Sequence, residues 1–129
     1  MSECSTGGVV AVVDDDPSIL RSLEYLLESA DHSVRVFTSG AALLESGCLP
    51  DIACLISDID MPGMDGFELL RAIHEARADL PMILITGYPE TLSRLSLPSG
   101  ANPPRVFTKP FAGPELLTAV SDALRRSPG

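Results

Sequence analysis

The sequence is poor in positive charge and has no long hydrophobic run. Nine lysines and arginines stand against 18 aspartates and glutamates, which gives a formal net charge of −9. Such a chain should repel nucleic-acid phosphates, so we expect no direct nucleic-acid binding by this segment. Its apolar runs reach about five residues, whereas a membrane-spanning helix needs about 20, so we expect no membrane partner.

Cysteines are few, and their spacing is not that of a disulfide framework. Cys4, Cys48 and Cys54 are odd in number and form no C-x-x-C pair, which argues against disulfides and a zinc site. Cys54 lies in an apolar run and is expected to be a core thiol. The chain begins without the basic and apolar segments of an export signal, so a cytoplasmic location is expected.

Apolar segments of two kinds alternate along the 129 residues, a length typical of one domain. Short β-branched or apolar runs predict strands, and apolar residues at helical spacing predict helices. The predicted strands cover 9–13, 34–37, 52–56, 82–85 and 105–108. The predicted helices start at Pro17, at about 41 after a Ser39 cap, near Phe67, and at 115. This alternation predicts an α/β fold, a doubly wound five-stranded parallel sheet with helices on both faces.

Polar residues follow four of the predicted strands. Asp14 and Asp15 follow the first, Asp58 the third, Thr86 the fourth and Lys109 the fifth. Ligands of such sheets bind at the carboxyl ends of the strands, so these side chains should converge. Clustered carboxylates repel unless a cation bridges them, and an all-oxygen set favours Mg²⁺ or Mn²⁺ over zinc. Because an aspartate can also act as a nucleophile towards phosphorus, the pattern predicts a phosphoryl-accepting carboxylate beside Mg²⁺.

Four stretches of the sequence resemble the motifs of response-regulator receiver domains. They are VVDDDP at 12–17, SDIDMPGMDG at 57–66, ITG at 85–87 and FTKPF at 107–111. The resemblance is to the CheY-like superfamily, in particular the FixJ-like branch of two-component systems, and it implies the strand order 2-1-3-4-5. It covers residues 8–126 as the receiver domain, leaving a flexible N-terminus at 1–7 and a tail at 127–129.

The resemblance implies a role for each acidic residue of the site. Asp58 matches the phosphoacceptor. Asp14 and Asp15 match the pair that holds Mg²⁺ together with Asp58, and the backbone carbonyl of Asp60 matches a further metal ligand.

Other positions match the residues that surround the phosphoryl group. Thr86 matches the hydroxyl that turns towards this group, and Lys109 matches the lysine that contacts it. Pro110 is expected to follow a cis peptide bond. Tyr88 lies two residues beyond Thr86, where it is either a residue at the pocket mouth or only an exposed aromatic.

The resemblance also implies partners. The donor is expected to be a phosphohistidine on a sensor histidine kinase or a phosphotransfer protein of a bacterial cytoplasm. The domain is expected to act as a switch rather than an enzyme. It would act on an effector domain or a protein partner, or through a phosphorylation-dependent dimer.

Two other functions fit parts of the pattern. A strand followed by D-x-D is also found in haloacid-dehalogenase-like phosphatases, but Pro62 stands where that family has Thr or Val. A flavodoxin-like cofactor binder expects a Ser-, Thr- and Gly-rich loop after the first strand, where three aspartates would repel a phosphate.

Several positions depart from the family or carry structural predictions. Val106 stands where the family usually has an aromatic ring, and Phe107 should point to the opposite face of the sheet. The proline-rich residues 91–104 predict a short or irregular fourth helix. Asp16 is expected either to cap a helix or to be an acid just outside the metal ligands, and His74 is expected to be at the surface or half-buried.

Overall fold

The strands of the protein form one parallel sheet. The computed structural model describes residues 9–47, 49–60, 66–77, 79–88, 90, 105–109 and 111–126. The strands are β1 (Val9–Val13), β2 (Ser33–Phe37), β3 (Ile52–Asp58), β4 (Met82–Thr86) and β5 (Arg105–Thr108). They lie in the order β2-β1-β3-β4-β5, with every neighbouring pair parallel. The predicted fold class and strand order are therefore confirmed.

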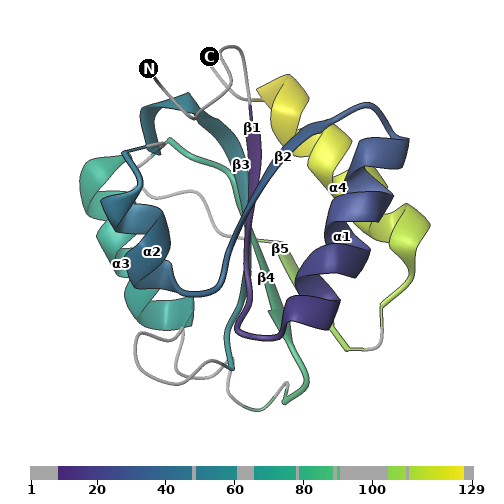
Figure 1. Ribbon diagram of the computed structural model, residues 1–129, viewed down its shortest axis with the longest axis horizontal. Helices are drawn as coiled ribbons and strands as arrows, with labels where there is room; N and C mark the ends of the chain where they lie inside the picture. The colour runs from purple at the N-terminus through teal and green to yellow at the C-terminus, as the bar shows by residue number, and fades with distance from the viewer. Residues whose placement is uncertain are drawn as a thin grey trace.

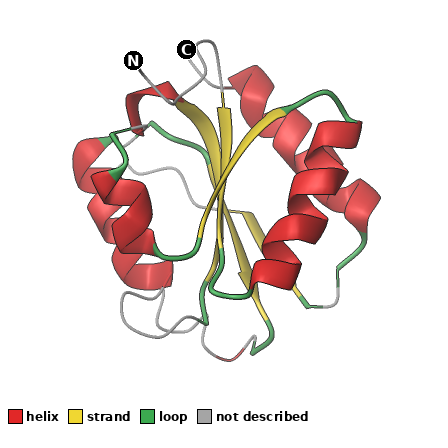
Figure 2. Cartoon of the chain, viewed as in Figure 1, coloured by secondary structure: helices red, strands yellow, loops and turns green. Residues whose placement is uncertain are grey.

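Helices cover both faces of this sheet (Figure 1). The helices in the described part of the chain are α1 (Pro17–Ser29), α2 (Gly40–Glu45), α3 (Gly66–Ala76) and α4 (Gly113–Arg126), with a short 3-10 turn at Leu49–Asp51. Figure 2 shows α1 and α4 on one side of the strands and α2 and α3 on the other. The result is a three-layer domain in which the central strands are covered on both sides.

The alternation of side chains along β1 divides the core into two halves. Val10 and Val12 belong to the apolar cluster on the α1 and α4 side, whereas Ala11 and Val13 belong to the cluster on the α2 and α3 side. A strand buried on both faces needs apolar residues at every position, which is why β1 is a continuous apolar run. Cys54 of β3 is fully buried, and burial raises the pKa of its thiol to about 12, as expected of a core cysteine.

Local signals set the starts of two helices. The Asp16 side chain accepts a hydrogen bond from Ser18 N at 2.9 Å, and Pro17 begins α1. The Ser39 hydroxyl accepts from Ala42 N at 3.0 Å at the start of α2. Both predicted caps are confirmed. Because one carboxylate oxygen of Asp16 is engaged in this cap, Asp16 is better explained as a cap than as a metal ligand.

The prediction for His74 is wrong. Its side chain is 8% exposed, and its Nδ1 atom has no hydrogen-bond partner among the described residues. His74 lies four residues beyond Leu70 and seven beyond Phe67, so it continues the apolar stripe of α3 that faces the sheet. Burial lowers the pKa of this imidazole and favours its neutral form. The neighbouring arginines misled the prediction, although Arg77 also turns inward and donates to the carbonyl oxygen of Leu49 at 3.1 Å.

Some predictions lie outside the described residues. They are the irregular fourth helix at 91–104, the cis peptide bond at Pro110, and the terminal segments 1–7 and 127–129. Within the described ranges, no helix combines the length and the apolar character that crossing a membrane requires.

Candidate functional site

The register of the sheet brings the acidic residues together. Val13 of β1 lies opposite Ser57 of β3, so Asp14 and Asp58 leave neighbouring strands side by side. Strands β4 and β5 follow on the other side of β3. The carboxyl ends of these strands thus share one edge of the sheet, as the sequence predicts.

Three carboxylates form a cluster at this edge. Asp14, Asp15 and Asp58 each offer an oxygen, and these oxygens all lie within 4.8 Å of one another. Asp14 and Asp58 are 3% and 4% exposed, whereas Asp15 is exposed. Asp14 Oδ1 accepts from Asp16 N at 2.9 Å and Asp58 Oδ1 accepts from Asp60 N at 3.0 Å, which fixes both carboxylates. An all-oxygen cluster of this kind has the donor chemistry that Mg²⁺ prefers.

The surroundings of Asp14 disfavour the ionised form of its carboxyl group. Burial raises the pKa of Asp14 to about 6, and the charge of Asp58 acts in the same direction. The hydrogen bond from Asp16 N and the charge of Lys109 oppose the shift without cancelling it. A cation bound beside Asp14 and the two other acids would stabilise their ionised carboxylates. The residues present therefore fit a divalent metal ion.

Lys109 compensates part of the negative charge of the carboxylate cluster. Its Nζ lies 3.2 Å from Asp58 Oδ2, and its backbone N donates to Thr86 O at 2.8 Å, which fixes the residue to the end of β4. Burial alone would lower the pKa of this amine. The negative charges of Asp58, Asp14 and Asp60 outweigh burial and raise the pKa. Lys109 therefore stays protonated beside the cluster.

Thr86 is joined to Asp60 by a contact that the sequence did not predict. Thr86 is completely buried, and its hydroxyl donates to Asp60 Oδ2 at 2.9 Å. The same carboxylate oxygen accepts from Gly87 N at 3.0 Å. The resemblance to receiver domains implies a metal-binding role for the backbone carbonyl of Asp60 and does not indicate this side-chain contact. The extra carboxylate two residues after Asp58 was the signal that could have pointed to a further role.

Tyr88 lies where the sequence places it, just beyond β4. Its backbone N donates to the Thr86 hydroxyl at 2.9 Å, and its side chain is 60% exposed. The position of Tyr88 agrees with both interpretations offered above, and its role at the pocket mouth stays a prediction.

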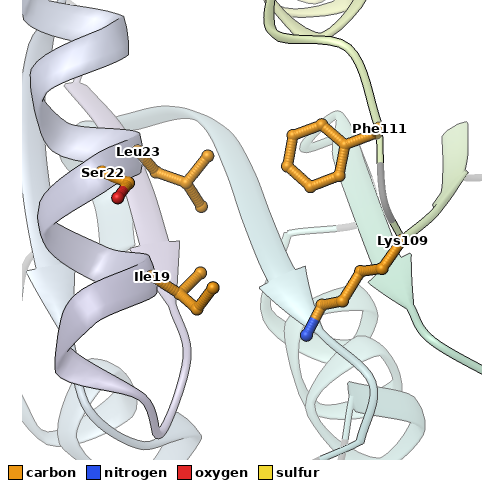
Figure 3. A pocket seen from close by; sticks show the side chains of 5 residues that line it. All are labelled: Ile19, Ser22, Leu23, Lys109 and Phe111. Carbon is orange, nitrogen blue, oxygen red and sulfur yellow. The ribbon is translucent and has the colours of Figure 1, made fainter.

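A pocket next to the site was not predicted. It has a volume of about 490 Å³ and is lined by Ile19, Ser22, Leu23, Lys109 and Phe111. Figure 3 shows the three α1 residues on one wall, facing the stem of Lys109 and the ring of Phe111 on the other. The pocket brings α1 into the surroundings of Lys109, which no local motif in the sequence indicates.

The two residues before Thr108 in β5 point to opposite faces, as predicted. Val106 packs against the core cluster on the α2 and α3 side. Phe107 is buried in the cluster on the α1 and α4 side and meets Phe111 edge-on, with ring centroids 6.0 Å apart. The aromatic ring of Phe107 therefore lies on the face of the sheet away from Val106.

Comparison with known proteins agrees with this geometry. A sequence model described as "Response regulator receiver domain" matches residues 10–121. The transcriptional regulatory protein FixJ of Azorhizobium caulinodans is 36% identical over 119 residues, which are 92% of this chain and 56% of that protein. The chain thus spans little more than half the length of this relative.

Solved structures show the same architecture. A CheY-like response regulator receiver domain protein from Methanospirillum hungatei superposes with a TM-score of 0.75 at 26% identity, covering 94% of this chain and 95% of that one. The BeF3-activated DrrB receiver domain gives 0.78 at 29% identity, with coverages of 92% and 97%. With a five-stranded 2-1-3-4-5 sheet, an acidic cluster at its carboxyl edge and a family match over most of its length, the chain belongs to the response regulator receiver domains of two-component systems.

Proposed function

We propose that this domain accepts a phosphoryl group on Asp58 from a phosphohistidine of a sensor histidine kinase or phosphotransfer protein. One observation carries the assignment: Asp58 is a buried carboxylate that lies within 4.8 Å of two other acids and 3.2 Å from the ammonium group of Lys109. We assign residues 8–126 to the functional unit, with 1–7 and 127–129 as flanking segments.

The transfer is a displacement at phosphorus. A carboxylate oxygen of Asp58 forms a bond to phosphorus while the bond between phosphorus and the histidine nitrogen breaks, and that nitrogen keeps the electron pair. Negative charge on the phosphoryl oxygens is stabilised by hydrogen-bond donors and positive charge beside them. The Lys109 ammonium, 3.2 Å from Asp58 Oδ2, and the Thr86 hydroxyl are the donors we assign to this role.

We assign Mg²⁺, or Mn²⁺ in its place, to the acidic cluster. The carboxylates of Asp14, Asp15 and Asp58 and the backbone carbonyl of Asp60 would hold it. When bound, the ion supplies positive charge to the phosphoryl oxygens. The raised pKa of Asp14, caused by burial and then by the charge of Asp58, supports this assignment, because a bound cation would stabilise the ionised carboxylate.

Incubation with acetyl phosphate separates the three candidate functions. With Mg²⁺, the intact mass should increase by one phosphoryl group, and the group should be lost slowly by hydrolysis. Without divalent metal, the increase should be absent. Continuous turnover of phosphoesters would instead indicate a phosphatase, and a bound flavin chromophore would indicate a cofactor binder.

The two acids after β1 should contribute unequally to metal binding. We expect Asp15→Asn to weaken Mg²⁺ binding more than Asp14→Asn, since Asp15 is exposed and Asp14 Oδ1 is already engaged by Asp16 N. Titration calorimetry of both variants measures the order. A larger loss for Asp14→Asn would contradict it.

The domain is proposed to pass its signal to another domain or protein. The relative described above is a transcriptional regulator about twice as long as the matched region, so an effector domain or protein partner is the proposed recipient of the signal. A dimer formed on phosphorylation is a second proposed output. The proposed role is that of a switch in a bacterial cytoplasm, and its own phosphorylation is the chemistry it promotes.

A further inference from the structure

The single proton of the Thr86 hydroxyl already has an acceptor in the structure. The shorter of its two donor contacts is to Asp60 Oδ2 at 2.9 Å and the longer is to the Tyr88 carbonyl oxygen at 3.3 Å, and the hydroxyl accepts from Tyr88 N at 2.9 Å. A hydroxyl has one proton to donate. Thr86 can therefore donate to a phosphoryl oxygen on Asp58 only after it releases the Asp60 carboxylate.

The contact with Asp60 is well placed to hold Thr86. The backbone of Asp60 is fixed, because its N donates to Asp58 Oδ1 at 3.0 Å, and its Oδ2 also accepts from Gly87 N. Hydrogen bonds to an ionised acceptor are stronger than neutral ones. The carboxylate thus ties the loop after β3 to the end of β4, across 26 residues of sequence.

We propose that the Asp60 carboxylate is a positioning residue that holds the Thr86 hydroxyl away from the phosphoryl site and so opposes the phosphorylated state. This inference rests on the proposed function, since it assumes that Asp58 carries the phosphoryl group. Phosphorylation then moves one proton donor from Asp60 to the phosphoryl oxygen. Forming the phosphorylated state requires the Thr86–Asp60 hydrogen bond to break, and this requirement lowers the population of the phosphorylated state.

The test is binding of beryllofluoride, which stands in for the phosphoryl group, measured by titration calorimetry with saturating Mg²⁺. Removal of the acceptor in Asp60→Ala should tighten binding about fivefold, the effect of one hydrogen bond of ordinary net strength. Asp60→Asn keeps an acceptor oxygen and the shape of the side chain, so its affinity should lie between those of the parent protein and Asp60→Ala. This isosteric variant also tests the idea if Asp60→Ala folds poorly.

The same substitutions in a Thr86→Ala background show whether Asp60 acts through Thr86. There the gain from Asp60→Ala should fall well below fivefold, because the hydroxyl that it restrains is gone. An equal gain in both backgrounds would mean that Asp60 acts only through its charge, and a loss of affinity on Asp60→Ala would mean that it does not restrain Thr86; either result overturns the inference. If the parent protein does not bind beryllofluoride at all, the proposed function itself fails.

Discussion

Asp58→Asn should abolish phosphorylation by acetyl phosphate. An amide oxygen is a far weaker nucleophile than a carboxylate, and its product would be an unstable cation. The variant should still fold, because the Asn Oδ1 atom can accept the hydrogen bond from Asp60 N in place of Asp58 Oδ1. Intact-mass measurement with Mg²⁺ present should show no added phosphoryl group.

A matched control lies at the other end of the same strand. Asp51 ends the short turn that precedes β3, at the edge of the sheet remote from the cluster. Asp51→Asn removes the same charge and should be phosphorylated like the parent protein. Phosphorylation of Asp58→Asn at the parent rate would show that another residue is the acceptor.

Asp14→Asn should stabilise the metal-free protein. Burial and the neighbouring Asp58 make the ionised form of Asp14 unfavourable in the folded state, and they raise its pKa to about 6. At pH 7.5 without Mg²⁺, the substitution should raise the free energy of unfolding by about 1–2 kcal/mol. This is less than the free energy that corresponds to the full shift of the pKa from 3.8 to about 6. Urea unfolding in a chelator measures this change.

The pH dependence of this effect has a defined sign. The folded-state pKa of Asp14 lies above the ordinary value of 3.8, so between these two values the folded protein binds more protons than the unfolded chain. The stabilisation by Asp14→Asn should therefore be absent below about pH 4, grow as the pH rises towards 6, and stay constant above it. The exposed Asp15 serves as a control, and Asp15→Asn should have a smaller effect. A stabilisation by Asp14→Asn that is independent of pH would contradict this explanation.

The framework of the site could be predicted from the sequence because its signals are local. β1 has an apolar residue at every position, which marks a strand buried on both faces, and Asp14 follows it directly. Parallel strands bring whatever follows them to one edge, so Asp58, Thr86 and Lys109 could be placed without knowledge of their side-chain contacts.

The details that escaped prediction depend on contacts between distant segments. The hydrogen bond from Thr86 to the Asp60 carboxylate depends on how the loop after β3 meets the end of β4, which no spacing encodes. The pocket beside Lys109 depends on how α1 packs across from Phe111. His74 was misjudged for another reason: its helical spacing placed it with Leu70 on the buried face, and this spacing was a better guide than the charges beside it.

The location of the phosphoryl group tests the central claim most directly. After treatment with acetyl phosphate and Mg²⁺, reduction with borohydride converts an aspartyl phosphate into homoserine, which peptide mass spectrometry can locate. We expect homoserine at position 58 and at no other aspartate, because Asp58 is the buried carboxylate that faces both the acidic pair and Lys109. Homoserine at Asp14, Asp15 or Asp60, with Asp58 unchanged, would contradict the assignment.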